Sequence, residues 1–326
     1  YYYYYYYHYY YFSGFLPSKL SKMGNSHCCE RAPITDNSMN YVIAVPLNTS
    51  NPQSTLTTGR KLGWLKDPAD PRDKVLKFAA AQYSATPSSV DLRSQENLEI
   101  YDQGSLGSCT AQAIGAAFHF CKVKVNQASF RPSRLFIYYN ERVDMGTVNQ
   151  DSGAYIRTGV KLCNKQGVCP ESMWPHDTSK WAAAPPAACY TEAMDHQTIE
   201  YASVNQTLQD LKVALASGFP VVFGFVVYSS FMTQAVANTG KVPMPTPWDS
   251  NNGGHAVMAV GYDDAQKVFI VRNSWGSSWG DKGYFYMPYN YLTSASLAQD
   301  FWVIRSVEDG DFPGEIEHRG DIPCCC

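Results

Sequence analysis

The chain has 326 residues, of which 45% are hydrophobic and 17% are charged, the composition of an ordinary soluble globular protein with a substantial core. Its 26 Lys and Arg residues nearly balance 29 Asp and Glu residues, and no basic cluster offers the surface that nucleic acid requires. No run approaches the roughly 18 apolar residues of a membrane span. The composition argues against a nucleic-acid partner and against a transmembrane segment.

The first 12 residues form a tyrosine-rich segment of low complexity, interrupted by His8. No basic stretch precedes it, so a cleavable signal peptide is poorly supported. With no targeting segment in view, extracellular, endolysosomal and virion-associated locations all stay open. Residues 13–84 follow as a leader, which up to about residue 60 is rich in Ser, Asn, Pro and Thr. That composition favours irregular structure.

Dense apolar periodicity predicts a folded domain over residues 85–307, and residues 308–326 form a polar tail. Apolar residues recur at i, i+3, i+4 and i+7, which predicts a helix over residues 109–122. Runs rich in β-branched and aromatic residues then predict strands. These strands cover residues 219–228, 255–262, 268–273, 283–287 and 301–307. A helix-rich half before a strand-rich half implies an α+β fold of two lobes, with a cleft between them.

The ten cysteines form neither a clear disulfide framework nor a metal-binding pattern. No C-x-x-C pair is matched by a second such pair or by spaced histidines, as structural zinc would require. We therefore assign no metal and no cofactor. The terminal cysteines, 324–326, fit no prenylation motif, which favours an unstructured tail over lipid attachment.

Cys109 opens the predicted helix and follows a tight polar turn that contains Gly104, Gly107 and Ser108. The unpaired N–H groups at a helix N-terminus lower a thiol pKa and favour the nucleophilic thiolate. A free cysteine is also among the residues most often buried as a small hydrophobe. The position alone therefore leaves both interpretations open.

A hydrolytic thiolate needs a base, and the seven histidines are the candidates. Those in the tyrosine-rich segment, the leader, the tail and the predicted helix are badly placed, which leaves His176, His196 and His255. Only His255 follows a glycine pair, Gly253 and Gly254, at the start of an apolar strand, where a ring can project from the sheet edge. A structural core histidine is the common alternative.

Two amide side chains could complete such a site. Asn273 ends a predicted strand, and its amide oxygen could orient the His255 ring while Trp275 excludes water from that hydrogen bond. Gln103 precedes Cys109 by six residues, and its amide could join the Cys109 backbone N–H around a developing oxyanion. Taken singly, either residue could instead be an ordinary turn or surface residue.

Three segments together resemble the motifs of the papain-like cysteine proteases. They are DQGSLGSCTA around the cysteine, GGHAVMAVGYD around the histidine and NSWGSSWGDKGYFY around the asparagine. In that family the His and Asn follow the Cys by about 130 to 150 residues, and here the intervals are 146 and 164 residues. The resemblance spans residues 85–307. It implies a helical lobe and an antiparallel β-barrel-like lobe, with the active site in the cleft between them.

The resemblance also implies roles by position. The catalytic set would be Gln103 as oxyanion donor, Cys109 as nucleophile, His255 as base, Asn273 as its orienter and Trp275 as its shield. The segment DSGAYIRTG is similar to the family stretch that binds substrate backbone as an added strand. The substrate-binding residues would be Gly153, Ala154, Tyr155, Gly253, Gly254 and Ala256. Small residues beside the histidine imply a main specificity pocket that is roomy and apolar.

The sequence departs from the commonest family pattern, Cys-Gly-Ser-Cys-Trp, because Leu106 and Thr110 occupy its first and last positions. It therefore resembles the bacterial and viral type branch more than the lysosomal cathepsins. The long helical pro-segment is absent, while GWLKDPADPRD, residues 63–73, looks like that branch's shorter leader. An intramolecular propeptide that inhibits the enzyme is the resulting hypothesis.

The implied activity is hydrolysis of peptide bonds in a peptide or protein substrate, through a thioester acyl-enzyme, by an endopeptidase made as a zymogen. Two alternatives stay open. One is a catalytically inactive homologue that holds peptides, because a fold does not guarantee an activity. The other is an acyltransferase that uses the same cysteine and histidine to pass the acyl group to an amine.

Overall fold

The computed structural model describes residues 59–96, 98–124, 130–305 and 315–318, all within one unit of the fold, residues 51–326. The predictions for the tyrosine-rich segment, for the leader before residue 59 and for the terminal cysteines lie outside these residues. The domain limits expected from the sequence stay predictions.

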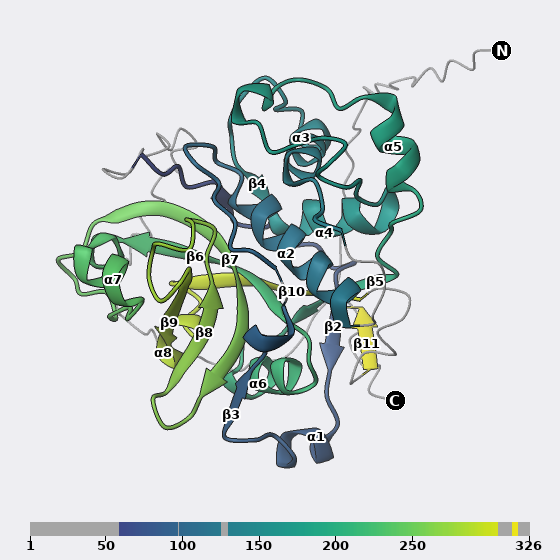
Figure 1. Ribbon diagram of the computed structural model, residues 1–326. Helices are drawn as coiled ribbons and strands as arrows, with labels where there is room; N and C mark the ends of the chain where they lie inside the picture. Colours follow the sequence, from purple (N-terminus) through teal and green to yellow (C-terminus); the bar gives the residue numbers. More distant parts are fainter. Residues whose placement is uncertain (1–58, 97, 125–129, 306–314, 319–326) are drawn as a thin grey trace, which may run out of the picture. The chain divides into compact units, whose positions relative to one another are not determined.

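The first half of the described chain is mainly helical, with α2 (Cys109–Lys124) at its centre (Figure 1). This helix begins at the residue expected from the sequence. α3 (Arg134–Asp144) and α4 (Ile156–Lys165) pack on one side of it, and the sheet packs on the other. Because its surroundings are protein on all sides, every residue of α2 up to Lys122 is buried. α2 is therefore a core element.

The other helices are short. They are α1 (Ala80–Ser84), α5 (Ala187–Ala193), α6 (Leu208–Ala216), α7 (Gln234–Thr239) and α8 (Tyr289–Leu292), with 3-10 turns η1 (Arg93–Gln95), η2 (Thr178–Lys180) and η3 (Ser229–Met232). Ser133 and Thr207 cap α3 and α6 by accepting backbone N–H bonds, as residues of these types commonly do. None of the helices in the described ranges is both long and apolar enough to cross a membrane.

A nine-stranded sheet forms the second half of the fold. Its strands are β2 (Lys74–Lys77), β3 (Ser89–Asp91), β5 (Glu200–Val204), β6 (Val221–Tyr228), β7 (Asn251–Asp263), β8 (Val268–Arg272), β9 (Tyr284–Pro288), β10 (Ala298–Arg305) and β11 (Glu315–His318). Their order is β11-β2-β5-β10-β6-β7-β8-β9, and β3 also pairs with β7. All pairings are antiparallel except that of β2 with β5.

The α+β class expected from the sequence is confirmed. Within the described residues the sheet follows an open path and does not close into a barrel. All five predicted strands are present, with ends that differ by a few residues. The largest difference is at β7, which begins at Asn251, because Gly253 and Gly254 still pair with Val227 and Val226 of β6.

The sheet register brings two predicted site residues together. Phe225 of β6 lies opposite His255 of β7, and Arg272, the last residue of β8, lies opposite Met258 of β7. Asn273 directly follows β8, so antiparallel pairing of β7 with β8 places it beside His255. Residues 18 positions apart in the sequence thus become neighbours across two strands.

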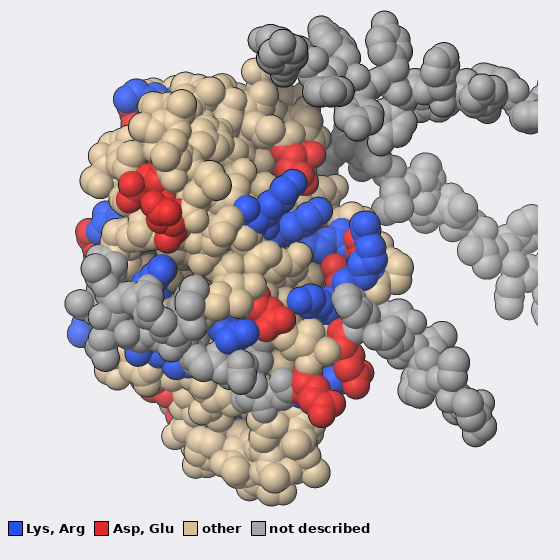
Figure 2. All heavy atoms as spheres, turned by 90° about the vertical axis from the view of Figure 1, so that its right-hand side faces the viewer, with Lys and Arg blue, Asp and Glu red and all other residues tan. Residues whose placement is uncertain are grey.

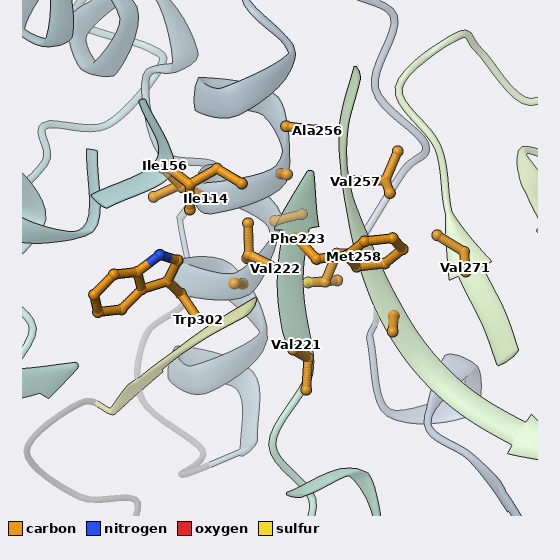
Figure 3. Close-up of a cluster of buried hydrophobic side chains, with 14 of the residues drawn as sticks. Ile114, Ile156, Val221, Val222, Phe223, Ala256, Val257, Met258, Val271 and Trp302 are labelled. Atoms are coloured by element: carbon orange, nitrogen blue, oxygen red, sulfur yellow. The ribbon is translucent and has the colours of Figure 1, made fainter. Parts of the chain in front are cut away.

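A hydrophobic core joins α2 to the sheet (Figure 3). Ile114 of α2 and Ile156 of α4 face Val222 of β6, and Trp302 of β10 lies at the edge of the same cluster. Each such side chain contributes roughly 1.5–3 kcal/mol when it leaves water. This packing fixes the position of the α2 N-terminus relative to β7.

The leader is attached to the body at two places. β1 (Trp64–Leu65) pairs in parallel with β4 (Ala154–Tyr155), and β2 lies inside the main sheet between β5 and β11. We call residues 60–67 the strap. On the face shown in Figure 2, Lys and Arg side chains are interspersed with Asp and Glu, so neither charge dominates it.

Candidate active site

Cys109 is fully buried at the first position of α2. Its sulfur accepts hydrogen bonds from the backbone N–H groups of Ala256, Gly63 and Thr110. The Thr110 contact is the expected helix N-terminus effect, which favours a thiolate. Burial outweighs it, however, and raises the pKa of the Cys109 thiol to about 12. The thiol is therefore protonated while the strap covers it.

His255 is fully buried in β7, and its Nε2 lies 2.8 Å from Asn273 Oδ1. The same Oδ1 accepts the Ser274 backbone N–H at 2.9 Å, which identifies that atom as the amide oxygen. Nε2 must therefore carry the proton and donate it, which leaves Nδ1 of the neutral ring as an acceptor. Among the described residues, Nδ1 has no hydrogen-bond partner. Burial lowers the pKa of His255 to about 4.

Aromatic rings cover the bond between His255 and Asn273. The Trp275 ring centroid lies 5.0 Å from that of His255, and Trp279 meets Trp275 edge-on at 5.1 Å. Asn273 and Trp275 are each only 2% exposed. Water is thus excluded from the hydrogen bond, which strengthens it and fixes the orientation of the imidazole.

Gln103 is fully buried, and its amide is held at both ends. Its Oε1 accepts a hydrogen bond from Ser274 Oγ at 2.7 Å, and its Nε2 donates to the Lys61 carbonyl at 2.9 Å and to the Leu106 carbonyl at 3.0 Å. Ser274 therefore determines which way the amide points. The sequence reasoning did not identify Ser274 as a site residue, although it directly follows Asn273.

The strap crosses the site and is anchored on both sides of Cys109. Arg60 pairs with Asp102, and Lys61 Nζ lies 2.6 Å from a carboxylate oxygen of Asp151. Two residues after Lys61, a Cβ added at Gly63 would lie 1.8 Å from the Gly107 carbonyl oxygen. Only glycine fits there, so the chain passes directly over the turn that precedes α2.

The sequence model of one protein family, the papain family cysteine proteases, matches residues 86–303 of the chain. The chain belongs to the papain family. An uncharacterized peptidase C1-like protein of Acanthamoeba polyphaga mimivirus is 45% identical over 279 residues, which cover 78% of this chain and 90% of that protein. A cathepsin B-like protein of Giardia intestinalis is 28% identical over 218 residues, covering 61% of this chain and 68% of its own length.

Among solved structures, xylellain, a cysteine protease from Xylella fastidiosa, superposes with a TM-score of 0.71. It is 43% identical, and the match covers 78% of this chain and 97% of xylellain. The family, the hydrolase class and the papain-like fold expected from the sequence are thereby confirmed. The roles of individual residues stay predictions, and they are taken up below.

The residues expected to bind substrate lie along the strap of this papain-family protease. Ala154 and Tyr155 pair with Trp64 and Leu65, and a Cβ added at Gly153 would lie 2.2 Å from the Gly63 carbonyl oxygen. In β7, Gly254 lies against the Trp64 ring, Ala256 bonds the Cys109 sulfur, and Gly253 directly precedes them. The leader thus occupies the surface nominated for substrate.

The other candidate histidines bond side chains other than Cys109. His176 Nε2 lies 3.0 Å from Gln112 Nε2, and His196 Nε2 lies 3.1 Å from Glu192. Both are therefore better explained by local packing. Within the described ranges, no group of three or more His, Cys, Asp or Glu side chains is arranged to hold a metal ion.

Glu141 is a buried carboxyl that sequence reasoning missed. It lies on α3 and accepts the Thr110 hydroxyl proton at 2.9 Å, one residue after the nucleophile candidate. A Cβ added at Gly159 would lie 2.3 Å from its Oε1, so the carboxyl is tightly enclosed. Burial raises the pKa of Glu141 to about 8, which leaves it neutral at pH 7. No motif in the sequence signals this contact.

Proposed function

We propose that the protein hydrolyses peptide bonds through a thioester acyl-enzyme, with Cys109 as nucleophile and His255 as base. The observation that carries this proposal is the hydrogen bond from His255 Nε2 to Asn273, which leaves Nδ1 as the proton acceptor. The Cys109 sulfur is within hydrogen-bonding distance of Ala256, the residue after His255. This contact supports a shared site in which α2 supplies the thiol and β7 supplies the base.

The reaction then has two halves. The Cys109 thiol passes its proton to His255, and the sulfur attacks the substrate carbonyl carbon. The resulting oxyanion accepts hydrogen bonds from the Gln103 amide and the Cys109 backbone N–H. His255 protonates the leaving amine, which releases the first product and leaves a thioester. Water, deprotonated by His255, hydrolyses the thioester to the acid and restores the thiol.

Asn273 would keep the imidazole in the productive tautomer, and Trp275 would shield that bond from water. The Lys61 carbonyl marks where the substrate oxygen would lie, because it already accepts the Gln103 amide proton. Gly153, Ala154, Tyr155, Gly253, Gly254 and Ala256 stay the proposed substrate-binding residues, because the strap lies along them. The expected partner is accordingly a peptide or protein substrate.

Labelling with an irreversible epoxide inhibitor, followed by peptide mapping, tests the nucleophile. We expect the label on Cys109 and no peptide cleavage by the Cys109→Ala variant. Cys163→Ala is a matched control, because Cys163 is also a buried free thiol but lies on α4. A label on another cysteine, or unchanged cleavage by Cys109→Ala, would remove Cys109 from the mechanism.

The same measurements separate the remaining alternatives. An inactive peptide-holding homologue would bind a peptide but neither cleave it nor take the label. An acyltransferase would give an amide product in place of the acid when an amine is added. An internally quenched peptide with both ends blocked tests for an endopeptidase, because only cleavage between internal residues can release its fluorescence.

We further propose that the protease is made as a zymogen, with the strap as its inhibitor. The strap supports this by occupying Gln103 with the Lys61 carbonyl and by bonding the Cys109 sulfur through the Gly63 N–H. Under the strap, the pKa of Cys109 is about 12 and that of His255 is about 4, because both are buried. Both groups are therefore neutral at pH 7, and no thiolate is available for attack.

The Gly63→Ala variant tests the zymogen. Its new Cβ would lie 1.8 Å from the Gly107 oxygen, so the strap must leave the site while the body of the protein is unchanged. We expect faster epoxide labelling and faster peptide cleavage. Gly59→Ala is the control for backbone strain alone, because Gly59 has a φ of 73° but no atom lies within 4 Å of an added Cβ. Equal labelling rates for Gly63→Ala and the unaltered chain would rule out inhibition by the strap.

A further inference from the structure

Thr110 connects the proposed nucleophile to a buried carboxyl. Its backbone N–H donates to the Cys109 sulfur, and its hydroxyl donates to Glu141 Oε2 at 2.9 Å. The commonest family pattern has tryptophan directly after the cysteine, so this hydroxyl is a departure of this chain. One residue thus contacts the sulfur with its backbone and the carboxyl with its side chain.

Three helices enclose the carboxyl of Glu141. The residue is fully buried on α3. A Cβ added at Gly159 of α4 would lie 2.3 Å from Glu141 Oε1 and 2.3 Å from the side chain of Ile114 on α2. Among the described residues, Oε1 has no hydrogen-bond partner. A carboxylate with one oxygen unpaired in such a place is unfavourable, so the neutral acid is favoured.

A charge on Glu141 would act on the nucleophile. The groups that face it are the Arg142 guanidinium on its own helix, the Asp67 carboxyl on the strap, and the thiols of Cys109 on α2 and Cys163 on α4. Burial raises the pKa of Glu141 to about 8, so the charge appears as the pH rises through that value. Together with burial, that negative charge raises the pKa of Cys109. Ionisation of Glu141 therefore opposes formation of the thiolate.

We propose that Glu141 is a positioning residue for the nucleophile, which holds the first turn of α2 through Thr110 and whose proton favours ionisation of Cys109. This inference rests on the proposed peptidase function and adds a regulatory proton to that site. The protonated carboxyl accepts the Thr110 hydroxyl without placing a charge near the sulfur. The ionised carboxylate disfavours the thiolate on which attack depends. The enzyme should therefore lose reactivity towards alkaline pH.

The rate of epoxide labelling of Cys109, read by peptide mapping, tests this directly. All proteins are full chains with Gly63→Ala, so that the strap, including Asp67, is away from the site. The rate with Glu141 divided by that of Glu141→Gln should be constant in acid and fall as the pH rises through about 8. We expect a fall of about 3- to 10-fold, the effect of a modest rise in the pKa of Cys109 on its thiolate fraction.

Two variants of Thr110 separate this role from a purely structural one. Against the effect of burial, the Thr110 hydroxyl lowers the pKa of Glu141. Thr110→Val keeps the shape and loses the hydroxyl, so the fall in labelling should move to higher pH. Thr110→Ser restores the hydroxyl and should restore the original pH. Loss of packing alone would lower the rate at every pH without moving the fall.

The Thr110 variants also keep the proposal testable if Glu141→Gln does not fold. The rate of Thr110→Val divided by that of Thr110→Ser should then rise as the pH passes about 8. Glu192→Gln is the matched control for the charge, because Glu192 is a carboxylate on α5 whose side chain is 41% exposed. A quotient for Glu141→Gln that is constant with pH would overturn the proposal. So would a fall at the same pH in both Thr110 variants.

Failure of this inference and failure of the peptidase proposal give different results. If the protein is not a peptidase, the epoxide does not label Cys109 at any pH and no peptide is cleaved. If only the role of Glu141 is wrong, the epoxide labels Cys109 and peptides are cleaved, but the quotient does not change with pH. Labelling and peptide cleavage measured on the same samples therefore distinguish the two.

Discussion

The amide of Gln103 is pre-positioned at both ends, which makes its contribution to catalysis measurable. Ser274 Oγ donates to its oxygen at 2.7 Å, and its nitrogen already donates to a carbonyl oxygen, that of Lys61. Preorganised donors of this kind stabilise the oxyanion without reorganising during the reaction. The side chain should therefore act on the transition state more than on the bound substrate.

We predict that Gln103→Ala lowers kcat by about 10²- to 10³-fold, the usual effect of losing one oxyanion donor, with a smaller change in KM. Steady-state kinetics in the Gly63→Ala background measure this. Gln197→Ala is a suitable control, because the Gln197 amide makes an exposed hydrogen bond to the carbonyl of Lys165, the last residue of α4. An unchanged kcat in Gln103→Ala would remove Gln103 from the mechanism.

Glu141 links the stability of the fold to pH. Burial raises its pKa from 4.5 to about 8, so the folded protein binds a proton that the unfolded chain releases. The stabilising effect of that proton is complete below about pH 4.5 and is lost as the pH rises through about 8. Glutamine has the same shape and no proton to lose, so Glu141→Gln lacks this part of the pH dependence.

We predict that the Tm of Glu141→Gln, relative to the unaltered chain, is higher at about pH 8.5 than at about pH 5, because only the unaltered chain loses the proton. Thermal unfolding of the full chain at both pH values measures this. Glu99→Gln is the control, since the Glu99 side chain is 74% exposed. The same Tm difference at both pH values would contradict a raised pKa for Glu141.

Residue types and spacing identified the catalytic candidates because each lies within a short motif. Gln103 and Cys109 share one turn, and Asn273 is in the turn after a recognisable strand. Glu141 could not be found in this way. Its partner Thr110 is 31 positions away in the sequence and is brought close only by the fold.

The strap carries its own titratable contact with the body. Asp67 Oδ2 accepts the Trp302 indole N–H at 2.9 Å, and its backbone N–H donates to Asp300. Burial and the nearby Asp300 carboxylate raise the pKa of Asp67 from 3.8 to about 7, against the opposing effects of Trp302 and Arg157. Burial also raises the pKa of Asp300, against the opposing effects of its hydrogen bonds and of Lys66 and Arg157. Glu141 lies close enough for its own pKa to be raised by Asp67.

The raised pKa of Asp67 determines how strap binding depends on pH. The pKa of Asp67 in the bound strap is raised, so binding of the strap takes up a proton. Strap binding is therefore strongest below about pH 4, weakens as the pH rises towards 7, and changes little above that. On this basis the protease opens towards neutral pH, whereas acid favours the inhibited form.

We predict that the rate of epoxide labelling of the unaltered chain, divided by that of Asp67→Asn, rises between about pH 4 and pH 7. The quotient removes the pH dependence of the thiol itself, because both proteins share it. Asp70→Asn is the control, since Asp70 belongs to the same leader but pairs with Arg72. A quotient that is constant with pH would show that Asp67 does not control the strap.

The elements themselves were largely predictable, because their burial patterns are simple. β6 is apolar almost throughout, as expected for a strand covered on both faces, and α2 begins at the turn residues that precede it. The strap was not predictable as strand. β1 has only two residues, and its pairing with β4 depends on a partner 90 positions away. Short segments of this kind carry no periodicity.

The leader is divided into two parts with different roles. Val75 and Leu76 of β2 are buried in the main sheet, so this part belongs to the structural core. The strap lies over the active site, and the link between them, residues 68–72, is mostly exposed. Inhibition and stability therefore depend on separate stretches of the same leader.

Cutting the link should separate inhibition from stability. We predict that replacing residues 68–72 with the recognition site of a specific protease, and cleaving there, activates the enzyme on dilution. The strap is then no longer tethered, so its effective concentration falls from about millimolar to that of the free fragment. The Tm should change little, because β2 keeps its place between β5 and β11.

The uncut protein is the control, and a synthetic peptide of residues 59–67 should restore inhibition. Low activity of the cut protein at high dilution, or a large fall in Tm, would show that strap and β2 act as one unit.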